Sequence, residues 1–338
     1  MIGAFLNSPK HFEIKKTAIP EPREGEVRVK IKMVGVCGTD VHLFQGHRLL
    51  DKPDIIGHEG IGVIDKLGKN VANRKLGARV VIEPNIPCKQ CKYCMSGRGN
   101  ICINKRIVGL SEVGCFAEYI VLPEAFCYDI PDIVSDEDAV TIEPTAVGLH
   151  ALFASSAKPG DTIAVFGLGA IGLLLTHVAL KLGFKVLVLE LDADKMNLAV
   201  SMGAINSNVT GETSEIREEA LAKFWMQNGV VSIFECAGSQ HTASMATAAA
   251  PRGSEIVLVG LSGNLATFKP LKIAREGISI IPSMIYDHPL DFQRAMQLIA
   301  SKVISPSFVI SRYMNLKDIQ SALEIASVGK ESKIVITI

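Results

Sequence analysis

The chain has no excess of charge of either sign: its 338 residues include 35 basic and 35 acidic side chains. Proteins that bind nucleic acid through its phosphates usually carry a basic surplus, so this balance argues against a nucleic-acid partner. No long run of like charge indicates a charged tail. Internal repeats and low-complexity segments are also missing, which favours ordinary globular domains.

The sequence also has no long uninterrupted apolar run. Its most apolar stretch, residues 163–191, is broken by glycines and by His177, Lys181 and Lys185, so it fits a strand, a helix and a second strand and not a membrane span. Residues 1–5 show no basic segment followed by an apolar one, so no signal peptide is expected. Eight cysteines without such a signal favour a reducing compartment, and the cytoplasm is the expected location.

The length and the 48% hydrophobic content predict two domains with a large core. Up to about residue 150 the pattern is one of short strands and turns. Residues 26–36 alternate between apolar and basic side chains, and residues 61–67 and 78–83 predict further strands. This half is expected to be mostly β, with long functional loops.

After a turn at residues 158–161 the sequence pattern changes, and segments typical of strands alternate with segments typical of helices. That alternation predicts a doubly wound parallel sheet with helices on both faces, an α/β fold. A helix at 289–300 and a strand at 333–338 are expected to return to the first domain. The predicted strands of the second half are 162–166, 185–191, 230–235 and 255–259, and its predicted helices are 170–182, 194–202 and 241–250.

Three glycines between a predicted strand and a predicted helix fit the dinucleotide-binding pattern G-x-G-x-x-G. Gly167 permits a tight turn, Gly169 lets the backbone approach a pyrophosphate, and Gly172 lets helix and strand pack closely. Ala170 and Ile171, at the start of the helix, place N–H groups toward the phosphates. The alternative is a strand–helix turn that binds no ligand.

An acidic residue follows the glycine loop at the expected distance. Glu190 ends the second strand of this half, eighteen residues after Gly172. Its carboxylate can accept hydrogen bonds from a ribose hydroxyl and would repel a 2′-phosphate, so the sequence predicts a preference for NAD over NADP.

Four cysteines crowd one short segment with the spacing C-x2-C-x2-C-x7-C. Thiolates at such gaps can converge on one ion, and four of them fill the tetrahedral shell of zinc, which leaves no open position and makes the ion structural. The alternative is a set of incidental thiols or disulfides. These residues are Cys88, Cys91, Cys94 and Cys102.

A second, mixed set of ligands lies upstream. Cys37, His58 and Glu59 offer a thiolate, an imidazole and a carboxylate. Three protein ligands leave a fourth zinc position open for water or substrate, which is the arrangement of a catalytic site. Glycines next to these residues permit the two loops to approach each other. Taken singly, each residue could be structural.

Taken together, these motifs identify the chain as resembling a zinc-dependent medium-chain dehydrogenase/reductase. They occur in the family's order and spacing over nearly the whole chain. Residues 142–150 (IEPTAVGLH) are similar to the sorbitol and polyol dehydrogenase branch, where a glutamate stands in place of a third ligand cysteine. The other matching segments are 35–42 (GVCGTDVH), 57–60 (GHEG), 88–102 and 167–172.

The resemblance implies a β-rich, GroES-like catalytic domain and a Rossmann domain that binds NAD. It also implies two zinc ions per chain: a catalytic ion held by Cys37, His58 and Glu59, and a structural ion in the cysteine lobe. Glu143 would lie beside the catalytic ion, either as an exchanging ligand or holding its water. The expected boundaries are 1–148 with 287–338 for the catalytic domain, 86–104 for the lobe and 149–286 for the Rossmann domain.

By the same resemblance, the reaction is hydride transfer between a secondary alcohol and NAD, giving the ketone. Thr39 would contact the substrate oxygen, and His42 would relay the proton to solvent. Val259 and Gly260 would pass the nicotinamide with backbone groups. Local turns at Thr39 and His42, and plain strand ends at the other two positions, are the structural alternatives.

The motifs leave the substrate open. Residues 284–287 (MIYD) lack the Arg-Tyr pair that sorbitol dehydrogenases tend to carry, so a diol, an inositol, a sugar-acid relative and a phosphorylated polyol all stay open. Arg48 and Lys52 are candidates for contacts with an anionic substrate. An amino-alcohol dehydrogenase resembling L-threonine 3-dehydrogenase and a catalytically silent NAD-binding protein are the competing hypotheses. The family suggests a homodimer or homotetramer.

Overall fold

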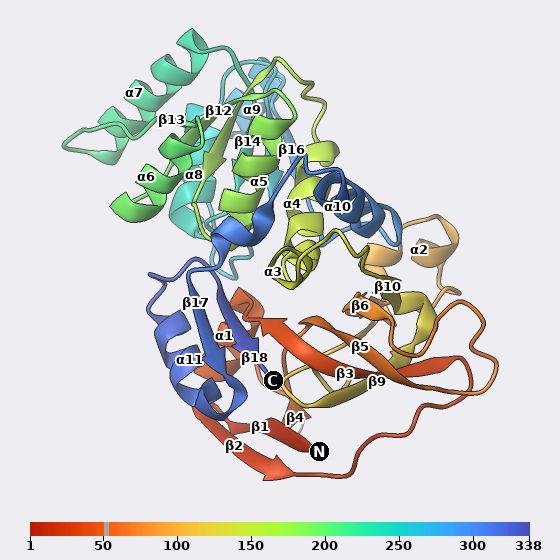
Figure 1. The fold of residues 1–338 in the computed structure, drawn as a ribbon. Coiled ribbons are helices and arrows are strands. Elements are labelled where there is room, and N and C mark those ends of the chain that lie inside the picture. The colour runs from red at the N-terminus through yellow and green to blue at the C-terminus, as the bar shows by residue number, and fades with distance from the viewer. Residues whose placement is uncertain (51–53) are drawn as a thin grey trace. The chain divides into compact units, whose positions relative to one another are not determined.

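The computed structural model describes residues 1–50 and 54–338. It divides into two compact units (Figure 1). The first unit comprises Met1–Glu143 and Asp287–Ile338, and the second is Pro144–Tyr286. Lys52, one of the candidates for an anionic substrate, lies outside the described residues.

The first unit is built around one long strand, β3 (Glu26–Gly35), as the alternation at residues 26–36 predicts. Val27, Val29 and Ile31 are buried, but the pattern changes at Met33, where Val34 becomes the buried residue. The cause is a register shift between Ile31 and Met33 against the neighbouring strand, since one inserted residue reverses the faces of those that follow.

The main sheet of the first unit has the order β10-β6-β5-β3-β18-β17, and β9 also pairs with β3. Strand β18 is the predicted final strand, and it pairs antiparallel with the carboxyl end of β3, so that the last strand of the chain joins the main sheet of the first unit (Figure 1). The bounds are β5 (Glu59–Leu67), β6 (Arg79–Ile82), β9 (Tyr119–Pro123), β10 (Cys127–Asp129), β17 (Arg312–Asn315) and β18 (Ile334–Thr337).

Smaller elements complete the first unit. A three-stranded sheet has the order β2-β1-β4, and β7 and β8 form a two-stranded ribbon. These strands are β1 (Ile2–Ser8), β2 (His11–Lys16), β4 (Asp54–Ile55), β7 (Asn85–Ile86) and β8 (Arg106–Ile107). The helices are α1 (Gly38–Gln45), α2 (Lys92–Met95), α3 (Asp136–Ala139), α10 (Leu290–Ala300) and α11 (Ile319–Ser327).

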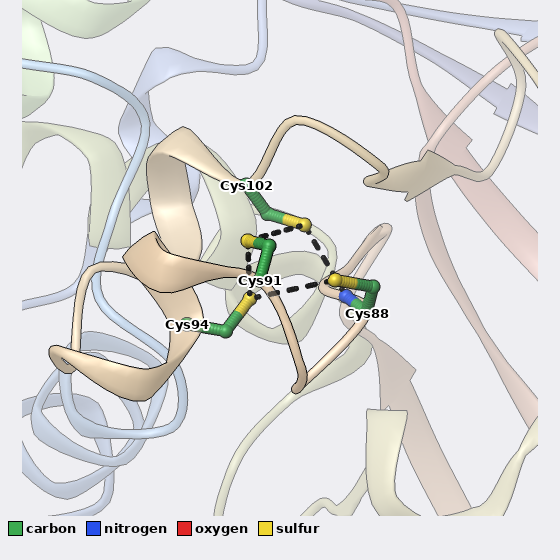
Figure 2. A group of neighbouring side chains, drawn as sticks. All are labelled: Cys88, Cys91, Cys94 and Cys102. Carbon is green, nitrogen blue, oxygen red and sulfur yellow. Dashed lines mark hydrogen bonds between the residues drawn. The ribbon is translucent and has the colours of Figure 1, made fainter.

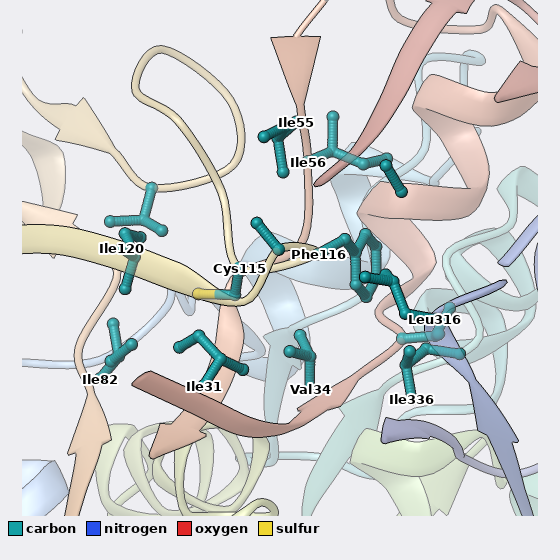
Figure 3. Close-up of a cluster of buried hydrophobic side chains, with 14 of the residues drawn as sticks. Ile31, Val34, Ile55, Ile56, Ile82, Cys115, Phe116, Ile120, Leu316 and Ile336 are labelled. Atoms are coloured by element: carbon teal, nitrogen blue, oxygen red, sulfur yellow. The ribbon is translucent and has the colours of Figure 1, made fainter. Parts of the chain in front are cut away.

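The core of the first unit joins segments that are far apart in the sequence. Ile31 and Val34 from β3, Phe116 from a loop and Ile336 from β18 belong to one buried cluster (Figure 3). Burial of such side chains stabilises the fold by roughly 1.5–3 kcal/mol each. The carboxyl end of β3, from which the loop to α1 starts, is therefore firmly held.

The second unit is a parallel sheet of six strands in the order β13-β12-β11-β14-β15-β16. From β11, the chain adds β12 and β13 on one side of the sheet and then β14, β15 and β16 on the other side. The reversal of strand order next to β11 is the switch point of a doubly wound fold. The strands are β11 (Thr162–Phe166), β12 (Lys185–Leu189), β13 (Ile205–Asn206), β14 (Val230–Glu235), β15 (Glu255–Leu258) and β16 (Ser279–Pro282). The helices are α5 (Ala170–Lys181), α6 (Ala193–Ser201), α7 (Ser214–Gln227), α8 (Gln240–Ala249) and α9 (Pro270–Glu276).

The apolar stretch at residues 163–191 is indeed a strand, a helix and a strand: β11, α5 and β12. Among the described residues, no helix is long and apolar enough to cross a membrane. All eight cysteines are free thiols, so none of the clustered cysteines is joined in a disulfide bond.

Candidate active site and metal centres

The pairing of β3 with β5 brings the mixed ligand set together. Gly35 at the end of β3 stands opposite Glu59 at the start of β5. Cys37 follows β3 as the N-cap of α1, and His58 directly precedes β5. The ligand atoms of Cys37, His58 and Glu59 all lie within 4.8 Å of one another. His58 and Glu59 are buried and Cys37 is half-buried.

Two glycines make this approach possible. A Cβ atom on Gly35 would lie 2.0 Å from Oε2 of Glu59. Gly57 has a φ of +91°, which is unfavourable for other residues, and a Cβ atom there would also meet the Phe116 ring at 2.9 Å. Side chains at these positions would push the carboxylate and the imidazole out of place.

Asp40 orients the histidine, and it was not predicted from the sequence. Its Oδ2 accepts a hydrogen bond of 2.9 Å from the Cys37 N–H, and its Oδ1 lies 3.5 Å from Nδ1 of His58. This arrangement leaves Nε2 of His58 for a metal ion, as in carboxylate–histidine–zinc triads. Burial alone would lower the pKa of His58, but the charges of Asp40 and then Cys37 raise it well above its usual value.

Lys333 is the second site residue that was not predicted from the sequence. It is 4% exposed, and its Nζ donates to both carboxylate oxygens of Glu59 at 2.7 Å and to the Val36 carbonyl at 3.1 Å. Burial opposes its charge, yet the Glu59 carboxylate raises the pKa of Lys333 above its usual value, so it is a cation. One clue in the sequence was a lone lysine at the start of an apolar strand.

Glu143 lies at the N-terminal end of helix α4 (Ile142–Ala154) and is buried. Burial, and then the nearby charge of Glu59, raise the pKa of Glu143 to about 7. Among the described residues, the set whose ligand atoms lie within 4.8 Å of one another contains Glu59 and not Glu143. In this structure Glu59 is thus the carboxylate grouped with Cys37 and His58.

The donor set fits a divalent cation. Three acids, Asp40, Glu59 and Glu143, are buried close together with the Cys37 thiol, and Lys333 and protonated His58 face them with positive charge. Asp40 Oδ1 and His58 Nδ1 are buried without a hydrogen bond of normal length. Buried negative charge is costly unless it is compensated, and a zinc ion would supply the missing positive charge.

Thr39 and His42 lie on helix α1 and not in a turn. Thr39 is half-buried, His42 is exposed, and Nδ1 of His42 is 3.4 Å from Nδ1 of His47. Arg48 is also exposed. Their roles toward a substrate stay predictions.

The four-cysteine cluster has the spacing of a zinc site. The sulfur atoms of Cys91 and Cys94 are 3.5 Å apart, those of Cys91 and Cys102 are 3.9 Å apart, and those of Cys88 and Cys94 are 4.0 Å apart. Zinc–sulfur bonds of about 2.3 Å give a tetrahedron with edges of about 3.8 Å. Figure 2 shows the four sulfur atoms pointing toward one another. The geometry fits one zinc ion with no open position.

Backbone N–H groups favour the thiolate form of Cys88 and Cys91, whereas burial and then the neighbouring thiols raise the pKa of Cys94 to about 12. The N–H group of Cys94 is the main cause that lowers the pKa of the Cys91 thiol to about 6. Four thiolates around one divalent ion leave two negative charges, and basic side chains of the same segment offset them. Residues 86–106 contain no acidic residue, and their basic residues are Lys89, Lys92, Arg98, Lys105 and Arg106.

Cys91→Ser is expected to remove the ion from this lobe and to lower the midpoint of thermal unfolding, because structural zinc sites contribute folding energy directly. Bound zinc, measured by atomic emission, should fall from two ions per chain to one. Cys127→Ala, at a buried thiol outside both ligand sets, is the control and should keep both ions. A Cys91→Ser protein of unchanged midpoint would contradict the structural role.

The glycine loop has the predicted form. It follows β11, Gly167 has a φ of +82°, and Gly169 is the N-cap of α5, which starts with Ala170 and Ile171. A Cβ atom on Gly172 would lie 1.9 Å from the Gly167 carbonyl oxygen. The first N–H groups of α5 therefore face outward at the carboxyl edge of the sheet, where a phosphate would bind.

Glu190 lies just after β12 and already binds the glycine loop. One carboxylate oxygen accepts a hydrogen bond of 2.6 Å from the Leu168 N–H, and the other accepts from Leu191 and Asp192 at 2.6 and 2.9 Å. Both oxygens are thus fixed in place, ready to accept further hydrogen bonds from ribose hydroxyls.

The N–H groups of Val259 and Gly260 donate to the carbonyl of Glu235, at 3.0 and 2.7 Å. A main-chain hydrogen bond from these two residues to a cofactor would therefore use their carbonyl groups. A separate cavity of about 320 Å³ in the first unit is lined by residues such as Phe5, Ile55 and Tyr119. None of the predicted site residues lines it, so it is not the candidate active site.

Two family models match the sequence. The alcohol dehydrogenase GroES-like domain matches residues 23–132, which lie in the first unit, and the zinc-binding dehydrogenase family matches residues 170–301. Sorbitol dehydrogenase of Bacillus subtilis is 30% identical over 331 residues, which cover 96% of this chain and 93% of that protein.

Solved structures show the same fold. Galactitol-1-phosphate dehydrogenase of Escherichia coli is 28% identical with a TM-score of 0.91, over 100% of both chains. A short chain alcohol dehydrogenase of Escherichia coli CFT073, solved with NADH, is also 28% identical with a TM-score of 0.91, over 100% of this chain and 99% of that one. The predicted GroES-like and Rossmann architecture is confirmed. The chain therefore belongs to the zinc-dependent medium-chain dehydrogenase/reductase family.

Proposed function

We propose that the protein is a zinc- and NAD-dependent oxidoreductase that transfers a hydride between a secondary alcohol and NAD, giving the ketone. The observation that carries this proposal is the convergence of Cys37, His58 and Glu59 within 4.8 Å, because three protein ligands leave one zinc position for the alcohol oxygen. The first unit is then the catalytic domain and the second the NAD-binding domain.

Cys37, His58 and Glu59 would hold the zinc ion, which would supply a Lewis acid that lowers the pKa of the alcohol hydroxyl toward neutral pH. The chain's own residues position this chemistry. Asp40 holds the His58 ring, and Lys333 holds both oxygens of Glu59. Glu143, buried beside this set, is proposed to exchange as a ligand or to hold water beside the ion. Thr39 and His42 are the proposed path for the substrate proton.

The substrate class that we propose is a polyol, a sugar alcohol or a sugar derivative. It is supported by the names of the relatives, which include sorbitol dehydrogenase, L-idonate 5-dehydrogenase and galactitol-1-phosphate dehydrogenase. Glu143, in place of a third ligand cysteine, supports the same branch. An amino-alcohol dehydrogenase resembling L-threonine 3-dehydrogenase shares these motifs and is the second candidate.

A substrate panel tests the proposal. The zinc-loaded protein is incubated with NAD and with sorbitol, xylitol, inositols, butanediols, threonine or phosphorylated polyols, and NADH formation is followed by absorbance. Fast turnover of one polyol class supports the first candidate, and preference for threonine supports the second. Zinc and NAD binding without turnover of any alcohol would favour a catalytically silent protein.

Glu190→Ala is expected to reduce the preference for NAD over NADP by about ten- to a hundredfold, the equivalent of one lost charge-assisted hydrogen bond and of relieved repulsion of a 2′-phosphate. The ratio of kcat/KM values for the two cofactors measures it. Asp194→Ala removes an exposed carboxylate on helix α6 and is the control. An unchanged ratio in Glu190→Ala would contradict the assignment.

We propose a homo-oligomer in the cytoplasm. The free thiols are consistent with a reducing compartment. Strand β16 is the last strand of its sheet, and Ile280 on it is 40% exposed. Unpaired, apolar edges readily pair with another chain, so a second copy related by a two-fold axis is the proposed occupant. Analytical ultracentrifugation of the purified protein tests this.

A further inference from the structure

The second unit offers two places at which an anion could bind. Strands β11 and β14 are neighbours, and each leads through a short loop into a helix, α5 and α8 respectively. N–H groups at helix N-termini attract negative charge, and in doubly wound sheets ligands bind at the carboxyl ends of the strands near the switch point. The glycine loop before α5 is one such place, and residues 236–239 before α8 are the other.

The second place is already filled by the protein. Glu235, the last residue of β14, is 2% exposed, and its Oε1 accepts hydrogen bonds of 3.0 Å from the N–H groups of Ala237 and Gly238. The Thr242 hydroxyl donates to the same oxygen at 2.7 Å. The Ser239 hydroxyl, 2.7 Å from that of Thr242, can supply its own proton to the Thr242 oxygen. The carboxylate thus occupies two N–H groups of the loop, and the Ser239 hydroxyl accepts from the Thr242 N–H in the first turn of α8.

Glu235 also joins this loop to its two neighbours. Its carbonyl oxygen accepts the N–H groups of Val259 and Gly260 after β15. A Cβ atom on Gly260 would lie 2.2 Å from the nitrogen of Gly238, so these two loops touch. On the other side, a Cβ atom on Gly167 would lie 2.7 Å from Ala237. Displacement of residues 236–238 would therefore disturb the glycine loop as well.

We propose that Glu235 is a positioning residue for the dinucleotide: it fills the anion-binding loop before α8, and it fixes the loops on both sides of the cofactor. The diphosphate of NAD is thereby confined to the glycine loop before α5. Glu190 acts differently, since its carboxylate accepts a hydrogen bond from the Leu168 N–H within the glycine loop and is proposed to bind the ribose. The inference rests on the proposed use of NAD.

Glu235→Gln tests the inference, because the amide keeps the shape but loses the charge and one acceptor. We expect the Kd for NAD to rise about tenfold, as for the loss of one charge-assisted hydrogen bond. The KM for the alcohol should stay unchanged. The matched control is Glu255→Gln at the amino end of the neighbouring strand β15, where Oε2 of Glu255 accepts from the Ser156 N–H and the Ser232 hydroxyl at 2.7 and 3.2 Å.

Thr242→Val is a second, milder variant that leaves Glu235 charged, and it should raise the Kd for NAD about threefold. This variant tests the inference if Glu235→Gln does not fold. An unchanged Kd for NAD in Glu235→Gln and Thr242→Val would overturn the inference, and so would an equal rise of this Kd in Glu255→Gln. The proposed function would stand in either case if the unaltered protein binds NAD. Failure of the unaltered protein to bind NAD would overturn both.

Discussion

Cys37→Ala is expected to lower turnover by at least about a thousandfold, because a metal ion contributes several kcal/mol to stabilising the reacting oxygen and each 1.4 kcal/mol is worth about a tenfold change in rate. The variant loses one of three protein ligands, and the remaining His58 and Glu59 are too few to hold zinc tightly. Bound zinc should fall to one ion per chain, retained in the cysteine lobe.

The fold should persist in Cys37→Ala, since Cys37 is the N-cap of α1 and not part of the buried apolar cluster. Circular dichroism and the midpoint of thermal unfolding check this. Cys127→Ala again serves as the control, because its thiol is buried in β10, where burial raises the pKa of the thiol above its usual value and keeps it unreactive. Near-full turnover by Cys37→Ala would show that the catalytic metal has been assigned to the wrong residues.

Lys333→Met is expected to destabilise the protein and to impair catalysis together. It leaves the buried carboxylate of Glu59 without its two hydrogen bonds of 2.7 Å. Removal of one partner of a buried ion pair costs about 3–5 kcal/mol, because the remaining charge stays uncompensated. We also expect the affinity for zinc at the mixed site to change, since Glu59 is then free to move.

The measurements are thermal unfolding, zinc content and kcat/KM. Lys330→Met is the matched control, three positions away and exposed. Glu59→Gln combined with Lys333→Met should be less destabilised than the sum of the single changes, because the double variant has no unpaired charge. Additive effects would show that the lysine and the glutamate act independently, which would contradict the proposed ion pair.

The sequence predicted helices and strands best where glycines or turns mark the ends of a clear apolar pattern. Strands β11 and β14 have the predicted bounds, and α5 differs from its prediction by one residue, because an apolar run or an apolar helical face is bounded there by glycines or turns. Helix α7 was not predicted. Of its fourteen residues only Leu221 and Trp225 are buried, so its apolar face is too narrow to show in the sequence.

At the site, the sequence predicted the candidate ligands because metal binding demands particular side chains, and the structure brings those side chains together; their binding of zinc stays a prediction. Asp40, Lys333 and Glu235 were missed, since their importance depends on contacts formed in the folded chain. Lys333, for example, meets Glu59 across 274 positions of sequence. Glu143 was expected beside the ion. Its exchange with Glu59 as a zinc ligand stays a prediction, which spectroscopy of the zinc-bound protein can test.

The most direct test of the proposed zinc-dependent mechanism is the dependence of NADH formation on bound zinc. The metal-depleted protein is titrated with zinc in the presence of NAD and the best alcohol of the panel, and the zinc content of each sample is measured. We predict no turnover without zinc and full turnover at two ions per chain. Full turnover by the zinc-free protein, or none at two bound ions with NAD bound, would contradict the mechanism.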